Sequence, residues 1–340
     1  MKDRNVPWAP CAPLFVEDCA KEVFKPRLVA AAMPVVLQTR GLRKTYGTVQ
    51  ALRGIDLDVQ RGEVFGFLGP NGAGKTTFTK CVTGFVRPDA GQVQVCGIDA
   101  LRHPERAAYH VGLVPDQYDF YSNLTGRQHL DFYGRLLGMP GHRRSDRIAA
   151  VLDVVRMNER ADTRVKGYSH GMKQRVCIAQ AILHEPDLVL FDEPTNGLDP
   201  KGAHELRQLM RELAKDGTTV FLNSHQLNEV EQTCERVAIL RQGQLATVSS
   251  VAELQRNAAK GGGTVQVRVL NPGAKQLTAA GKVLGAKPAF AGNVLEFSGD
   301  EALTAEVVSA LVAAGAQIAA VTPTAATLEN AFLELTEASA

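Results

Sequence analysis

The residues that most clearly specify chemistry form a glycine-rich run at positions 69–77, which reads GPNGAGKTT. The run fits the phosphate-binding template G-x-x-x-x-G-K-[ST] at every required position. Glycines let successive backbone N–H groups curl around a phosphate, and a following helix directs its N-terminal partial positive charge at the same anion. Lys75 would add a full charge, and Thr76 would offer a hydroxyl to a Mg²⁺ ion that bridges the terminal phosphates. The predicted nucleotide-binding residues are Gly69, Pro70, Asn71, Gly72, Ala73, Gly74, Lys75, Thr76 and Thr77.

Two adjacent acids form a second set of chemical groups. Asp192 and Glu193 follow the apolar run at 187–191, which is typical of a strand buried on both faces. Paired carboxylates at the tip of such a strand are rarely structural. A helix that begins after Ser169, a natural N-cap, and ends at Pro186 would provide a second N-terminal anion site.

A phosphate-binding loop needs a strand before it and a helix after it. Residues 63–68 read as a buried strand, and residues 75–83 read as a helix that Gly84 stops. The order of strand, loop and helix is therefore the one that this chemistry requires.

Further elements are expected around this unit. Residues 35–39 and 51–59 alternate apolar and polar side chains like a half-buried antiparallel pair, residues 92–95 alternate in the same way, and residues 111–114 read as a buried strand. Apolar residues at helical spacing predict a packed helical insert within 130–155. Together they suggest a mixed sheet that carries a nucleotide at its edge.

Six short motifs occur in an order that resembles the nucleotide-binding subunit of ATP-binding cassette (ABC) transporters, over residues 35–250. The order is an aromatic loop, the phosphate loop, a glutamine loop at 114–117, a signature at 168–172, the acidic strand, and a histidine switch at 223–225. The resemblance implies an α/β fold of the P-loop NTPase class, the ABC cassette, with a mixed sheet core plus antiparallel β and helical subdomains.

Three segments are similar to a narrower group within this family. They are residues 116–125, residues 168–172 and the ending at 327–335. The group comprises bacterial ABC-2-type exporter ATPases, which are separate chains that serve exporters of drugs, polysaccharides, lipid-linked or other hydrophobic substrates.

The resemblance implies that the chain binds and hydrolyses ATP with Mg²⁺. Lys75 and the amides of the phosphate loop would hold the β- and γ-phosphates, and Thr76 with Asp192 would hold Mg²⁺. Glu193 is placed like the family's general base. His225 stands in the position of the switch histidine and would touch the γ-phosphate, whereas the other seven histidines are expected at the surface.

Three further positions match family motifs. Tyr46 matches the aromatic residue that stacks on adenine, and Asp199 is the best match in the loop that links the two sites across a dimer. In the glutamine loop, Asp116 stands in the usual place of the glutamine and Gln117 follows it. Either could contact Mg²⁺ through water, so the sequence leaves this choice open.

The signature departs from the usual family pattern, which reads LSGGQ. Here His170 replaces the first glycine and Met172 replaces the glutamine, while Ser169 and Gly171 remain to contact phosphate. In the family this helix serves the nucleotide of the opposite subunit, so the resemblance implies a head-to-tail homodimer or heterodimer that holds two ATP molecules. The residues expected to act in trans are Ser169, His170, Gly171 and Met172.

The chain divides into three predicted parts. Residues 1–33 form an irregular N-terminal extension, and we expect Met33 to be the natural start, with the preceding residues disordered or mis-annotated. Residues 34–258 form the ABC nucleotide-binding domain, which ends at a glycine-rich break. Residues 264–340 form a C-terminal accessory domain with the order β-α-β-β-α-β, in which the middle two strands are expected at 286–290 and 294–297. A helix near 328–335 follows, and the order suggests a small ferredoxin-like module for dimer support or regulation.

Composition limits the partners. The formal net charge of +2 is too near neutral to indicate a nucleic-acid partner. The apolar runs are shorter than the ~20 residues that a membrane span needs. The six cysteines lack C-x-x-C spacing, and several lie in apolar runs where a buried free thiol is expected, which fits a reducing compartment. Together with these limits, the resemblance implies a cytoplasmic chain, peripheral at the inner face of the cell membrane and bound to a separate integral-membrane permease.

The leading hypothesis is an ATPase subunit of a bacterial exporter. The alternative is a soluble, non-transport ABC ATPase that acts on a macromolecular assembly, although those that act on ribosomes usually carry two cassettes and this chain has one phosphate loop. A nucleotide-sensing switch that barely hydrolyses ATP is a third hypothesis, and the presence of Glu193 argues against it.

Overall fold

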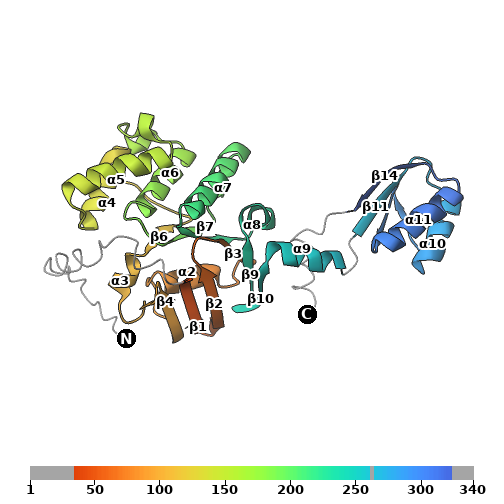
Figure 1. Cartoon of the computed structure of the whole chain (residues 1–340), viewed down its shortest axis with the longest axis horizontal. Helices are drawn as coiled ribbons and strands as arrows, with labels where there is room; N and C mark the ends of the chain where they lie inside the picture. The colour runs from red at the N-terminus through yellow and green to blue at the C-terminus, as the bar shows by residue number, and fades with distance from the viewer. Residues whose placement is uncertain (1–33, 261–263, 324–340) are drawn as a thin grey trace, which may run out of the picture.

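The computed structural model describes residues 34–260 and 264–323. Figure 1 shows a large α/β unit, the helix α9 (Val251–Lys260) and a small α+β unit at the C-terminal end. The hypotheses about residues 1–33 and about a helix near 328–335 lie outside the described residues. In the part of the chain that is described, no helix has the length and apolar character needed to cross a membrane.

The core of the large unit is a six-stranded sheet with the order β10-β9-β3-β8-β7-β6. Its strands β3, β6, β7, β8 and β9 run parallel, and β10 pairs antiparallel with β9 at one edge. Strands β3, β7 and β8 are buried along their whole length, as their uninterrupted apolar runs predict. The bounds are β3 (Val64–Leu68), β6 (Val111–Val114), β7 (Leu188–Asp192), β8 (Thr219–Ser224), β9 (Arg236–Arg241) and β10 (Gln244–Ser250).

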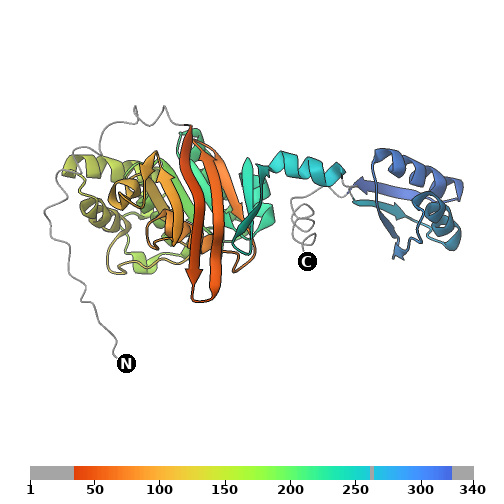
Figure 2. The same ribbon diagram turned by 90° about the horizontal axis from the view of Figure 1, so that it is seen from below.

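A second, antiparallel sheet has the order β2-β1-β4-β5. Strands β1 (Val35–Tyr46) and β2 (Val49–Gln60) form the long hairpin seen in Figure 2. The first strand extends well beyond the expected residues 35–39, whereas the second agrees closely with the expected 51–59. Their inward side chains join the aromatic cluster of the central sheet, in which Phe78 of helix α2 stacks on Phe67 and Phe221. The other bounds are β4 (Ala90–Val95), β5 (Ile98–Asp99) and α2 (Lys75–Val82).

The remaining elements of the large unit are helices and two short 3-10 turns. A capping box at Thr125 opens α4, because the Thr125 hydroxyl accepts from the Gln128 backbone N–H while the Gln128 side chain accepts from the Thr125 N–H. Helix α6 ends at Ala181, before the expected end at residue 185. The bounds are α3 (Pro104–Ala108), α4 (Gly126–Leu136), α5 (Gly141–Val154), α6 (His170–Ala181), α7 (Pro200–Lys215) and α8 (Leu227–Thr233), with short 3-10 turns at Asn158–Arg160 and Val165–Gly167.

The C-terminal unit has its own antiparallel sheet with the order β12-β13-β11-β14 and its own apolar core. Its described elements confirm the predicted β-α-β-β-α-β order. The strand expected at 286–290 is wrong in position, because only Phe290 and Ala291 pair, and Pro288 lacks the backbone donor that a ladder needs. The unit comprises β11 (Thr264–Val269), α10 (Ala274–Leu284), β12 (Phe290–Ala291), β13 (Val294–Ser298), α11 (Glu301–Ala313) and β14 (Ile318–Pro323). The domain boundaries at 258 and 264 stay predictions.

The burial of the cysteines follows the prediction, and the burial of one histidine does not. Cys81, Cys177 and Cys234 are buried free thiols, as predicted. The expectation that the other histidines lie at the surface is wrong for His129, which is only 1% exposed. Its ring packs between Phe120 and Tyr133, so aromatic neighbours from separate segments bury a residue that hydropathy treats as polar.

One polar cluster ties the two sheets together at the start of β7. Asp187 accepts hydrogen bonds from Arg61 (2.5 Å) and from His110 Nδ1 (2.7 Å), and Arg61 also contacts Cys96 Sγ at 3.6 Å. Burial alone would raise the pKa of Asp187, but these two donors outweigh it and lower the pKa to about 2. Cys96, His110 and Asp187 lie close enough together to ligate a metal ion. The Arg61 guanidinium already neutralises the Asp187 carboxylate, so the cluster needs no metal ion for charge balance.

We predict that Asp187→Asn lowers the unfolding free energy by about 2 kcal/mol at pH 7, as a pKa lowered by nearly two units implies. Because the folded pKa is depressed, this contribution is complete above the pKa of an unfolded aspartate, about 3.9, and is lost as pH falls through about 2. Urea denaturation followed by circular dichroism measures the difference. Asp162→Asn, which breaks an exposed ion pair with Arg127, is the matched control and should change stability little. Equal stability of Asp187→Asn and the wild type would contradict the assignment.

Candidate functional site

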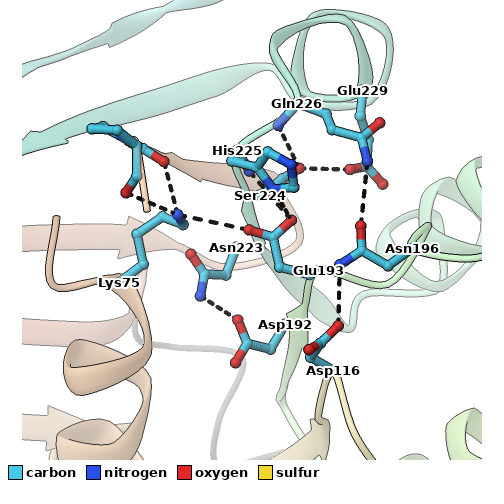
Figure 3. A network of polar contacts seen from close by, with 12 residues as sticks. Lys75, Asp116, Asp192, Glu193, Asn196, Asn223, Ser224, His225, Gln226 and Glu229 are labelled. Carbon is cyan, nitrogen blue, oxygen red and sulfur yellow. Dashed lines mark hydrogen bonds and ion pairs between the residues drawn. The ribbon is translucent and has the colours of Figure 1, made fainter. Parts of the chain in front are cut away.

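The topology of the central sheet brings four distant segments to one edge. Strands β3, β8, β7 and β6 are parallel neighbours, so the segments that follow them emerge side by side. In register, Leu68 pairs with Ser224 and Asp192 pairs with Asn223. The phosphate loop, the two acids, the histidine and the glutamine loop therefore meet at this edge, and Figure 3 shows residues from all four segments in one network.

The phosphate loop adopts a backbone that only glycine tolerates at two positions. Gly72 and Gly74 have φ angles of +81° and +112°. A Cβ atom at Gly74 would also lie 2.4 Å from the backbone oxygen of Ala51. Gly74 is the N-cap of α2, so the N–H groups at the start of this helix lie within the loop.

Lys75 places its charge inside the site. Its side chain is 7% exposed, and its ammonium donates to the backbone oxygens of Gly69 (2.7 Å) and Pro70 (3.3 Å). The same ammonium lies 3.7 Å from Glu193 Oε1. Lys75 is therefore held at the loop by neutral carbonyls and directed at a carboxylate.

Glu193 contacts both of the other predicted catalytic residues. Its Oε2 accepts from His225 Nδ1 at 2.7 Å and from the His225 backbone N–H at 3.3 Å, while its Oε1 faces Lys75. Glu193 also has a φ of +49°, which is unusual for a residue with a side chain. Such strain, of order 1–3 kcal/mol, persists where the surroundings fix it and concentrates at functional sites.

Asp192 supplies a buried carboxylate next to Glu193. Asn223 Nδ2 donates a hydrogen bond to it. Burial raises the pKa of Asp192, and the negative charges of Glu193 and Asp116 add to the rise, against the opposing effects of Asn223 and Lys75. Three carboxylates therefore lie near one another, and only Glu193 has a positive side chain, Lys75, within ion-pair distance at 3.7 Å.

This donor set fits a magnesium ion. Mg²⁺ prefers oxygen ligands, and a divalent cation would relieve the repulsion that raises the pKa of Asp192. Thr76, an exposed residue in the first turn of α2, follows Lys75 and would provide a hydroxyl oxygen as a second ligand. Among the described residues, the buried amide oxygen of Asn223 has no hydrogen-bond partner, so a further acceptor is available beside Asp192.

Asn196 connects the segments that follow β6, β7 and β8. Its Nδ2 donates to Asp116 Oδ1 at 3.1 Å, and its Oδ1 accepts from Gln226 Nε2 at 3.4 Å. Asp116 is thus held by the network. The choice between Asp116 and Gln117 for the glutamine-loop role stays a prediction.

The other predicted residues are placed as follows. Ser169 caps α6 by accepting from the Met172 backbone N–H at 3.3 Å, so His170 and Gly171 form the first turn of that helix. Tyr46 ends β1 with 46% exposure. Asp199 caps α7 by accepting from the Gly202 backbone N–H at 2.8 Å. Asp199 therefore has a structural role as the N-cap of α7. Its role in linking the two nucleotide sites of a dimer stays a prediction.

Sequence reasoning missed several residues of this network. Asn223 and Asn196 were parts of recognised segments but had no role of their own. Glu229 was not singled out, yet it is 4% exposed and accepts from Ser224 Oγ at 2.7 Å. It lies in α8, which packs on β3 and β8, and its acidic type four residues after His225 was the signal in the sequence.

Comparison with known proteins agrees with this geometry. A family model for ABC transporters matches residues 52–196. The chain is 35% identical over 219 residues to the linearmycin resistance ATP-binding protein LnrL of Bacillus subtilis (strain 168), a match that covers 64% of this chain and 70% of the relative. The chain belongs to the ATP-binding proteins of ABC transporters.

Two further similarities extend the comparison within this family. The bacitracin transport ATP-binding protein BcrA of Bacillus licheniformis is 37% identical over 214 residues, which cover 63% of this chain and 69% of the relative. A solved dimeric ATP-binding cassette in a post-hydrolysis state, bound to ADP and Pi, has a TM-score of 0.57 and 26% identity, and the match covers 63% of this chain and 98% of that chain. The central and antiparallel sheets thus belong to an ABC cassette that acts as an ATPase.

We predict that Lys75→Ala weakens binding of MgATP at least about tenfold, because a charge-assisted hydrogen bond contributes roughly 1.5–3 kcal/mol. Isothermal titration calorimetry measures the affinity. Lys80→Ala is the matched control, since Lys80 lies on the same helix with an exposed side chain. Unchanged affinity of Lys75→Ala would refute the assignment of the phosphate loop.

Proposed function

We propose that the chain is the ATP-hydrolysing subunit of a bacterial exporter and powers a separate membrane-spanning permease by nucleotide-driven closure of a dimer. The observation that carries the proposal is the contact of Lys75, Glu193 and His225 at the edge where the phosphate loop and Asp192 also lie. The relatives named for linearmycin resistance and bacitracin transport support the exporter assignment.

The first task of the site is to neutralise the charge of the triphosphate. Lys75 is fixed by the carbonyls of Gly69 and Pro70, so it can turn its charge toward the β- and γ-phosphates with little reorganisation. The amides of the phosphate loop and the start of α2 add partial positive charge. When bound by Thr76 and Asp192, Mg²⁺ would neutralise charge on the phosphate oxygens.

The second task is to align and deprotonate the attacking water. The carboxylate of Glu193 is the acceptor for that proton, and its position is fixed by its own backbone and by two donors from His225. Since Nδ1 of His225 donates to Glu193, a protonated ring could donate from Nε2 to the γ-phosphate at the same time. His225 would thus hold Glu193 in position and hydrogen-bond the γ-phosphate.

The third task requires a second copy or a related chain. Ser169 and Gly171 lie at the exposed N-terminus of α6, a helix of 12 residues whose first N–H groups suit an anion. We propose that they contact the nucleotide of a partner cassette, so that ATP draws two chains together and hydrolysis releases them. The dimeric cassette bound to ADP and Pi supports this arrangement.

A groove beside the site suits a helix of the permease. It has a volume of 440 Å³ and is largely apolar, between the end of α2, helices α3 and α4, and Pro115, which precedes Asp116. Phe85 and Leu136 on its rim are 73% and 62% exposed, a large apolar surface for a chain without a partner. Because Pro115 leads directly to Asp116, an occupant of this groove could sense the nucleotide. Such docking would place the chain in the cytoplasm at the inner face of the membrane.

We predict that Glu193→Gln reduces ATP turnover at least about 100-fold, since loss of a general base removes 10²–10⁴-fold of rate. ATP affinity should stay similar, and a nucleotide-bound dimer should accumulate in size-exclusion chromatography with light scattering. The control is Glu253→Gln in α9, where the carboxylate only accepts from Ser249 Oγ. Phosphate release by Glu193→Gln at the wild-type rate would refute the role of Glu193.

We predict that Phe85→Glu with Leu136→Glu abolishes association with an integral-membrane partner, because charge in an apolar groove opposes docking. The tagged full chain is purified from detergent extracts of native membranes, and the co-purifying integral-membrane protein is quantified. Val312→Glu, at another exposed apolar residue in α11, should leave association intact. Equal recovery of the partner by the double variant would rule out this groove, and a wild-type chain without any such partner would favour the non-transport alternative.

A further inference from the structure

His170 stands where the family signature usually has a glycine, and its side chain makes two defined contacts. Its Nε2 lies 3.1 Å from the backbone oxygen of Asn196. A carbonyl oxygen can only accept, so Nε2 carries the hydrogen in this contact. The ring also stacks on Tyr118, with centroids 6.1 Å apart and planes at 22°. The ring is therefore fixed from two sides.

The residue that His170 contacts, Asn196, links two other segments of the polar network around the proposed site. Asn196 donates through its side chain to Asp116 and accepts from Gln226. The next residue, Gly197, has a φ of +74°, and a Cβ there would lie 3.4 Å from His170 Nε2. The backbone at Asn196 is thus packed closely against the imidazole, and its conformation determines where the Asn196 amide points.

We propose that His170 is a positioning residue for ATP hydrolysis. It fixes the backbone of Asn196, and the Asn196 amide in turn holds Asp116 at the edge that binds nucleotide. His170 does this for the site of its own chain, in addition to its place in the signature that faces the partner's nucleotide. This inference rests on the proposed ATPase function and identifies Asp116, through Asn196, as the residue of the glutamine loop that this chain uses.

A direct contact of His170 with phosphate fits the geometry less well. The Nε2 hydrogen is directed at the Asn196 carbonyl of the same chain, so it is not available to an anion. The stacking on Tyr118 restricts the ring from turning toward another partner. Both observations favour an action through Asn196.

Three variants of the full chain separate the donor from the ring. His170→Gln keeps an N–H donor at similar reach, His170→Phe keeps the ring and loses the donor, and His170→Gly restores the usual family residue. We expect kcat for phosphate release to fall about fivefold in His170→Phe and His170→Gly, as the loss of one hydrogen bond implies. His170→Gln should stay within about twofold of the wild type, and KM for ATP should change little in all three.

A double-mutant cycle with Asn196→Ala tests the route of the effect. If His170 acts through the Asn196 amide, then His170→Phe should cause no further loss of kcat in the Asn196→Ala background. Additive losses would overturn the proposal and indicate a separate contact, for example with the partner's nucleotide. A His170→Gly variant as active as the wild type would overturn it as well.

The same assays distinguish this inference from the proposed function. If the wild type releases phosphate no faster than Glu193→Gln, the ATPase assignment itself fails. If the wild type is active and the His170 variants are unchanged, only the positioning role fails. Unaltered circular dichroism and ATP affinity confirm that each variant is folded, and His170→Gln and His170→Gly keep the test decisive if His170→Phe does not fold.

Discussion

The structure brings three carboxylates and one buried lysine together where the parallel strands of the central sheet end, and the proposed function depends on this cluster. Glu193 pairs with the buried Lys75, and the proximity of Glu193 and Asp116 contributes to the raised pKa of Asp192. Carboxylates at such a position are costly unless a cation or a hydrogen bond compensates them. A cluster of this kind is suited to bind a divalent cation together with a phosphate chain, because the cation would compensate the carboxylates.

The backbone accepts strain to keep these groups in place. Glycine at position 74 permits a left-handed turn against the Ala51 carbonyl, and Glu193 adopts a left-handed conformation without being a glycine. The parallel register of β3, β8, β7 and β6 then aligns the segments with no direct connection between them. Hydrophobic burial beneath the edge, above all the aromatic cluster of Phe67, Phe78 and Phe221, stabilises this arrangement.

Much of this could be predicted from the sequence, because strict spacing encodes the phosphate loop and continuous apolar runs encode buried strands. The contacts of Asn196 could not be predicted, since a polar residue in a loop has no periodicity and its partners lie in the segments that follow two other strands. The burial of His129 likewise depends on rings from separate segments. The short strand at Phe290 was misplaced because local propensity does not determine where a partner strand begins and ends.

The most direct measurement is a crystal structure of the full chain with Mg²⁺ and a non-hydrolysable ATP analogue. The account predicts that Lys75 Nζ and His225 lie within hydrogen-bond distance of the γ-phosphate, that Asp192 and Thr76 lie beside the metal ion, and that Ser169 of a second copy closes the site. A nucleotide bound elsewhere on the chain, or bound at this edge with Lys75 still engaged only by the Gly69 and Pro70 carbonyls, would contradict it.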